Sequence, residues 1–143
     1  MPLPDEHADQ MVFVVTGASL RAEMMDRPLA YQIRQAVEER IADWAGWRCA
    51  VISDVWYLNN DRFSHQPTIS VGGPGVNALS AHLYECLPTT LAIDNVLLIQ
   101  MDLSFEDTRC AVWGMDHETT VDAVEIFLKK GHLDRFLSCL SAI

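Results

Sequence analysis

The stretch that most constrains the fold of this chain is Thr68–Ser80, with the sequence TISVGGPGVNALS. Its first four residues are mostly β-branched and lie between a proline and a glycine, which predicts a short strand. Three glycines follow, and glycine permits turns and close approaches that a side chain prevents. Apolar residues at helical spacing begin at Ala78 and predict a helix that ends before Pro88. This order of strand, glycine-rich turn and helix is typical of α/β domains.

The turn itself has features that favour an anion. A helix N-terminus carries free N–H groups and a partial positive charge. Pro74 suits the first helical position, and the Asn77 amide can point to the same space. The turn has neither the Gly-Lys-Ser/Thr of a P-loop nor the G-x-G-x-x-G spacing of a dinucleotide site. Two interpretations stay open: a contact site for a phosphate or carboxylate, or a turn that only connects strand and helix.

Strand and helix patterns alternate along the rest of the chain. The apolar run Met11–Val15 predicts a strand buried on both faces, and apolar residues three or four apart predict a helix over 28–45. Further strands are predicted at Cys49–Leu58, Val96–Met101 and Arg109–Trp113, two helices are predicted on either side of Gly131, and loops are predicted at 18–27, 59–66 and 88–95. Thr119 and Asp122 have the spacing of a capping box at the start of the first of these two helices.

These elements predict a single-domain three-layer α/β sandwich, with a mostly parallel five-stranded sheet. The short gap between the last two predicted strands predicts one antiparallel hairpin. Residues 1–10 contain two prolines and three charged residues. They are predicted to be a flexible leader, and residues 11–143 are predicted to form the domain.

Composition narrows the class of protein. A chain of 143 residues is long enough for one domain with its own core. Its net charge of −10 argues against nucleic acid and anionic membranes as partners. The four cysteines lie in apolar segments without a CxxC pair, and the N-terminus does not resemble a signal peptide, which together favour a cytoplasmic protein with reduced thiols. Half of the residues are hydrophobic, so we expect some apolar surface to be covered in a homo-oligomer.

Polar residues follow most of the predicted strands, and open α/β sheets bind ligands beyond the carboxyl ends of their strands. We therefore predict a ligand-binding or sensing domain for a small anionic molecule. The glycine turn would bind the acidic group, Arg21 would neutralise it, and Asn77 and Asp116 would orient it. The predicted ligand-binding residues are Arg21, Asp54, Gly72, Gly73, Gly75, Asn77, Asp116 and Thr120. No metal site is predicted, and the sequence does not identify a cofactor.

Two pieces of the chain together show a family resemblance. Residues 72–77 have the form G-G-P-x-x-N, and residues 114–123 have the form G-x-D-x-x-x-T-x-x-A just after a strand. This pair, in this order, resembles a pattern found in archaeal surface-layer-type domains, over about two dozen residues. The matching positions are Gly72, Gly73, Pro74, Asn77, Asp116 and Thr120. The resemblance implies that the two loops lie side by side, and it implies no activity.

Other chemistries remain as alternatives. A small enzyme could use Asp54 or Asp116 as its acid–base group, helped by His65 or His117. A structural subunit could use the apolar surface and the tryptophans to build an assembly.

Two more specific sites can be imagined. His82 and Cys86 lie four residues apart on a predicted helix and could face one metal ion. Ser70, with an aspartate and a histidine, could form a hydrolytic triad, although the chain lacks the G-x-S-x-G elbow.

Overall fold

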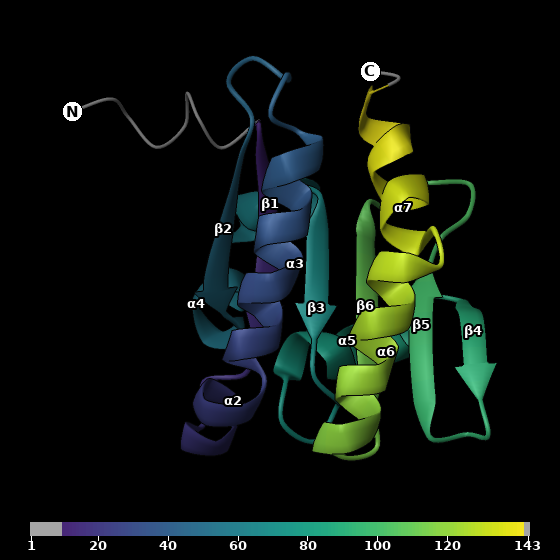
Figure 1. The fold of residues 1–143 in the computed structure, drawn as a ribbon. Helices are drawn as coiled ribbons and strands as arrows, with labels where there is room; N and C mark the ends of the chain where they lie inside the picture. The colour runs from purple at the N-terminus through teal and green to yellow at the C-terminus, as the bar shows by residue number, and fades with distance from the viewer. Residues whose placement is uncertain (1–9, 142–143) are drawn as a thin grey trace.

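The computed structural model describes residues 10–141, and its centre is a sheet flanked by helices (Figure 1). The strands are β1 (Met11–Thr16), β2 (Arg48–Ser53), β3 (Thr68–Val71), β4 (Thr89–Ile93), β5 (Leu97–Met101) and β6 (Arg109–Gly114). The helices are α2 (Leu20–Met25), α3 (Arg27–Arg40), α4 (Asp54–Leu58), α5 (Ala78–Cys86), α6 (His117–Lys129), α7 (His132–Ser141) and the short 3-10 helix η1 (Asp61–His65). The predicted leader lies outside the described residues, apart from Gln10.

The strands form one sheet in the order β2-β1-β3-β6-β5-β4. Neighbours among β2, β1, β3 and β6 are parallel, whereas β5 is antiparallel to both β6 and β4. The mostly parallel sheet and the β5–β6 hairpin are confirmed. The number of strands was wrong, because the part of the chain that the structure describes contributes six rather than five.

The sixth strand, β4, lies in a segment predicted to be a loop. Asp94 and Asn95 join it to β5 with positive φ angles of 52° and 58°, and the Val96 N–H donates to the carbonyl of Ile93 at 2.9 Å. Positive φ at both central residues is the mark of a two-residue hairpin turn, and Asp and Asn tolerate it better than most residues. The segment is therefore a hairpin arm at the edge of the sheet.

The predicted second strand was too long. It ends at Ser53, whose hydroxyl accepts a hydrogen bond from the Trp56 N–H at 3.3 Å and so caps α4. Asp54 then lies in the first turn of a helix, where a negative charge is favourable. A similar cap by Ser19 starts α2 inside the predicted loop 18–27. The helix predicted over 28–45 also ends early, at Arg40.

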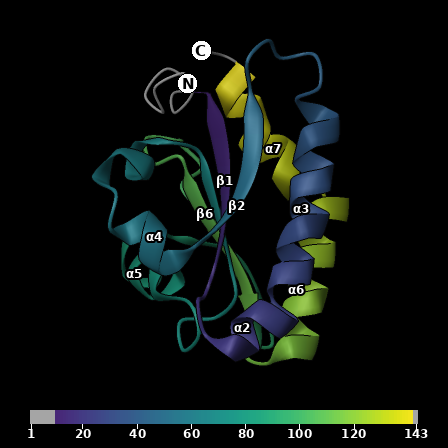
Figure 2. The ribbon, with the colours of Figure 1, turned by 90° about the vertical axis from the view of Figure 1, so that its left-hand side faces the viewer.

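The core lies on both faces of the sheet. Along β1, Val12 and Val14 pack with the residues of α3, α6 and α7, while Phe13 and Val15 pack with those of α4 and α5. This alternation follows from the two-residue period of a strand, and Figure 2 shows the two groups of helices on opposite sides of the sheet. Burial of β1 on both faces is confirmed. Within residues 10–141, no helix is both long and apolar enough to cross a membrane.

The parallel strands β1, β3 and β6 end at the same edge of the sheet, the lower edge in Figure 1. The chain leaves β1 and β6 toward the face that holds α3 and α6, but it leaves β3 toward the face that holds α5 (Figure 2). Connections that depart to opposite faces leave a crevice between the strand ends, which is where open α/β sheets bind ligands.

Candidate functional site

A pocket of about 770 Å³ occupies this crevice. Its walls come from the loops that follow β1, β3 and β6, and its volume suits a small organic molecule. Five of the eight predicted ligand-binding residues line it: Arg21, Gly73, Gly75, Asp116 and Thr120. The two loops with the family resemblance therefore do lie side by side. Asp54, Gly72 and Asn77 are not brought to the pocket.

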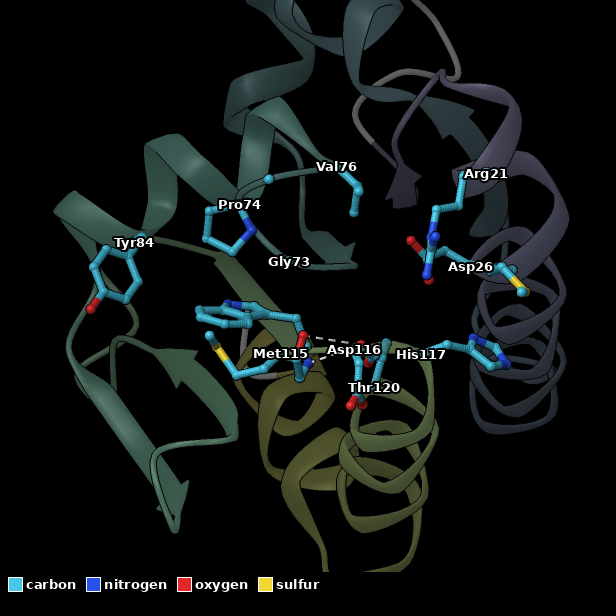
Figure 3. A pocket seen from close by; sticks show the side chains of 14 residues that line it. Arg21, Asp26, Gly73, Pro74, Val76, Tyr84, Met115, Asp116, His117 and Thr120 are labelled. Carbon is cyan, nitrogen blue, oxygen red and sulfur yellow. Dashed lines mark hydrogen bonds between the residues drawn. The ribbon is translucent and has the colours of Figure 1, made fainter.

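The charged side chains gather at one end of the pocket. Figure 3 shows the side chains of Arg21 and Asp26 reaching toward the same space, with His117 on the same side. Asp26 is only 6% exposed, and its carboxylate oxygens, which accept no hydrogen bond from a described residue, are not fully enclosed. Burial raises the pKa of this carboxyl above its ordinary value, and the positive charges of His117 and Arg21 partly oppose that rise. Asp26 is thus a buried acid without a bonded partner.

Two glycines make room for this arrangement. Gly72 has a φ of 106°, and a Cβ built on it would lie 2.7 Å from a carboxylate oxygen of Asp26. Only glycine admits the acid so close to the backbone. A Cβ on Gly17 would collide with the carbonyl oxygen of Val76, so this glycine lets the loop after β1 rest against the glycine turn. Gly72 therefore positions Asp26 and does not itself line the pocket.

Several hydrogen-bond donors around the pocket have no partner among the described residues. Within the described residues, the backbone N–H groups of Gly73 and Gly75 and the guanidinium of Arg21 have no hydrogen-bond partner. The indole Nε1 of Trp113 and the Nδ1 of His117 are buried and have no partner there either. Buried polar atoms are nearly always hydrogen-bonded in native proteins. The two buried atoms therefore indicate ordered water nearby, whereas Arg21 and the Gly75 N–H are open to solvent and available to a ligand.

The other end of the pocket is apolar. Trp113 and Tyr84 lie with their ring centroids 6.0 Å apart, and Pro74 and Met115 complete this wall. Tyr84 is 53% exposed and Met115 is 67% exposed, so large apolar side chains border the opening. Figure 3 shows Tyr84 and Met115 on the side opposite Arg21 and Asp26. The pocket therefore joins a charged end to an apolar end.

Asn77 supports the glycine turn from inside the protein. Its side chain is 1% exposed and donates to the carbonyls of Val15 and Val71 at 3.1 and 2.9 Å. Its oxygen accepts the N–H groups of Leu79 and Ser80 at 2.9 and 3.2 Å. The helix therefore begins after Asn77 and not at Pro74. This corrects the expectation that the Asn77 amide orients a ligand, because all four of its hydrogen bonds are internal.

Asp54 is held in the same region. It is 5% exposed, and its two oxygens accept the N–H groups of Val55 and Ala78, each at 2.7 Å. Together with Asn77, it occupies the first free N–H groups of α5. This arrangement corrects the expectation that the N-terminus of α5 receives an anion, since its donors are already used.

Asp116 and Thr120 shape the pocket wall at the start of α6. Asp116 accepts the Thr119 N–H at 2.8 Å in a capping box, and these hydrogen bonds lower its pKa. The predicted capping pair, Thr119 with Asp122, was therefore shifted by one turn. The hydroxyl of Thr120 accepts the Gly114 N–H at 3.0 Å and donates to the carbonyl of Asp116 at 2.7 Å. Both side chains are engaged in holding the loop.

The described residues do not have the arrangement that a metal site or a hydrolytic triad requires. His82 Nε2 and Cys86 Sγ lie 3.5 Å apart on the exposed side of α5. No group of three or more potential ligands is placed to hold a metal ion within residues 10–141. The hydroxyl of Ser70 is fully buried and lies 2.7 Å from that of Ser80, so it does not face the pocket.

Neither a protein-family model nor a curated protein matches this chain. The resemblance to surface-layer-type domains therefore stays a prediction. The residues that line the pocket are therefore the basis for a proposed function.

Proposed function

We propose that this protein is a small-molecule binding domain whose ligand carries an acidic group. The observation that carries the proposal is the set of unpartnered donors around the pocket, from Arg21, Gly73 and Gly75. Oxygen atoms of a carboxylate or phosphate complement such a set, and charge strengthens each hydrogen bond. Arginine supplies the neutralising charge in an otherwise acidic protein.

The apolar end suggests the body of the ligand. Trp113, Tyr84 and Met115 offer an aromatic and thioether surface beside the charged end. Flat apolar groups pack well on such surfaces. An organic acid with an aromatic or similar apolar body therefore fits better than inorganic phosphate.

The proposal can be tested with 3-phenylpropionate and its alcohol analogue, 3-phenylpropanol, by ¹H–¹⁵N NMR. We expect the acid to shift the indole N–H of Trp113 and the amides of Gly73 and Gly75, and the alcohol to bind more weakly. Trp113→Phe would assign the indole signal among the four tryptophans.

Gly75 offers a matched pair of variants. No atom lies within 4 Å of a Cβ placed on it, so both Gly75→Asp and Gly75→Asn should fold. The new carboxylate should repel an anion and weaken binding about tenfold or more, whereas the neutral amide should not. Equal binding of the acid and the alcohol, or shifts confined to other faces, would contradict the proposal.

A second candidate is an enzyme at the same pocket, favoured by the buried Asp26 with its raised pKa beside His117. A carboxyl with a raised pKa can act as a general acid or base. The acids first suggested for this role, Asp54 and Asp116, are engaged in helix caps. Turnover of an organic acid by native protein, lost in Asp26→Asn while binding is kept, would favour this candidate.

We also propose a cytoplasmic homo-oligomer. Cys49, Cys86, Cys110 and Cys139 are all free thiols, as in reducing compartments. Leu20, Met24 and Trp56 are 76%, 66% and 58% exposed, which is unusual for apolar residues unless a partner covers them. Sedimentation velocity at micromolar concentration tests the assembly, and a monomer there would contradict it.

A further inference from the structure

Asp26 differs from the unpartnered donors of the pocket. It brings a carboxylate to the same end as the guanidinium of Arg21. Only 6% of Asp26 is exposed, although its carboxylate oxygens are not fully enclosed. A mostly buried carboxylate is stabilised by a hydrogen-bonding or charged partner. Arg21 and His117 attract it through space, but neither donates a hydrogen bond to it.

We propose that the ligand is amphoteric: an α-amino acid with an apolar side chain, whose ammonium group binds Asp26. This inference rests on the proposed function, because the carboxylate of the amino acid would take the place of the acidic group. The carboxylate binds Arg21 and the free N–H of Gly73. The side chain lies toward Trp113 and Met115 at the apolar end.

The spacing of the pocket groups fits this class of ligand. The Asp26 carboxylate lies against the backbone of Gly72, and the unpartnered N–H of Gly73 belongs to the next residue. An acceptor for an ammonium and a donor for a carboxylate are therefore close together. An α-amino acid carries both groups on one carbon, and its side chain leaves from that same carbon. Figure 3 shows the apolar side chains across the pocket from the charged ones.

Simpler ligands leave part of the pocket unsatisfied. A plain organic acid engages the donors but adds a second negative charge near Asp26. A plain amine neutralises Asp26 but leaves the Gly73 N–H and the Arg21 guanidinium without an acceptor. Only a ligand with both charges complements both sets of groups. The same reasoning excludes inorganic phosphate, which has no donor in its fully charged form and no apolar part.

Three probes separate these cases by isothermal titration calorimetry: L-phenylalanine, 3-phenylpropionate without the ammonium, and 2-phenylethylamine without the carboxylate. We expect phenylalanine to bind tightest, with each of the other two weaker by roughly tenfold or more, the usual effect of losing one charge-assisted contact.

Two variants assign each charge to its partner. Asp26→Asn should abolish the advantage of phenylalanine over 3-phenylpropionate. Arg21→Gln should abolish its advantage over 2-phenylethylamine. Asp122→Asn and Arg48→Gln change the same charges on exposed residues outside the pocket and should leave all affinities unchanged. Asp26→Asn removes a buried charge and could affect folding. Thermal denaturation is therefore used to check that this variant is folded.

The outcomes distinguish this inference from the proposed function. If 3-phenylpropionate binds as tightly as phenylalanine to native protein, the amphoteric ligand is wrong and the anion pocket stands. The same conclusion follows if Asp26→Asn keeps the preference for phenylalanine. If neither carboxylate binds at millimolar concentration, both proposals fail.

Discussion

Two buried aspartates at the same edge of the sheet have opposite surroundings. Asp54 and Asp26 are 5% and 6% exposed. Asp54 accepts two backbone N–H groups at 2.7 Å, and Asn77 beside it makes four hydrogen bonds. Asp26 makes none through its side chain with the described residues. The two acids are therefore equally buried, but only Asp54 has hydrogen-bond partners for its carboxylate.

The difference separates structural polar groups from groups available to a ligand. A buried polar group with its full set of partners stabilises the fold, because breaking those bonds leaves unsatisfied atoms inside. A buried acid without a bonded partner destabilises the fold and persists where function requires it. The variants below test whether the two regions differ in this way.

The largest effect is expected at the start of α5. Asn77→Ala should lower the free energy of unfolding by about 3 kcal/mol or more, because it removes four hydrogen bonds and strands the carbonyls of Val15 and Val71. Urea denaturation measures this loss. Asn77→Asp keeps the acceptor for the Leu79 N–H but loses the donors to Val15 and Val71. Its stability should lie between those of native protein and Asn77→Ala. Unchanged stability of Asn77→Ala would show that the turn does not depend on this residue.

A smaller loss is expected at Asp54. Asp54→Asn should destabilise the protein by about 2 kcal/mol, since one of its two backbone partners would face an amide N–H instead of a carboxylate oxygen. Asp61→Asn is the matched control, because that acid is exposed and its side chain makes no hydrogen bond with the described residues. Equal denaturation midpoints for the two variants would contradict the structural role of Asp54.

The smallest effect, with the opposite sign, is expected at Asp26. Burial raises the pKa of this carboxyl in the folded protein above its ordinary value of 3.8, so the folded state holds the proton to higher pH than the unfolded chain does. Stability is therefore lost as pH rises through the folded pKa. Asp26→Asn should melt a few degrees higher than native protein at pH 7.

That advantage should shrink as the pH falls from the raised folded pKa toward 3.8, and it should be gone well below 3.8, where the carboxyl is protonated in both states. Comparing melting temperatures of variant and native protein across pH 3–8 isolates Asp26 from the other acids. A variant less stable than native protein at pH 7 would show that Asp26 has a stabilising partner and resembles Asp54.

Local patterns predicted much of the fold. The buried run at Met11–Val15 and the short strand Thr68–Val71 were found because strong apolar or β-branched runs lie between turn residues. The segment after Ser53 was misassigned, since Asp-Val-Trp-Tyr-Leu reads as a strand unless Ser53 is recognised as a helix cap. The arm β4 was missed for a similar reason: the Asp94–Asn95 pair is a hairpin signal that was not used.

The site was predicted as a place but not as a set of residues. Strand ends and the glycine turn indicated the crevice, because that rule depends only on strand order and direction. Whether an acid faces the crevice or caps a helix depends on distant contacts, such as Asp54 with Ala78, which are 24 residues apart. Asp26 looked like part of a charged loop. Its burial depends on Gly72 lying opposite, and no local pattern encodes that contact.

The close approaches at Gly17 and Gly72 have a consequence for how the pocket can diversify. A backbone oxygen packs against Gly17 and a carboxylate oxygen packs against Gly72, each where a Cβ would clash. The outline of the cavity therefore depends on the main chain. The apolar wall is formed by side chains such as Tyr84 and Met115, which are exposed and can be substituted without disturbing the core. Relatives of this protein should therefore keep the two glycines and differ in the residues of the apolar wall. Such differences would change ligand specificity without changing the backbone around the pocket.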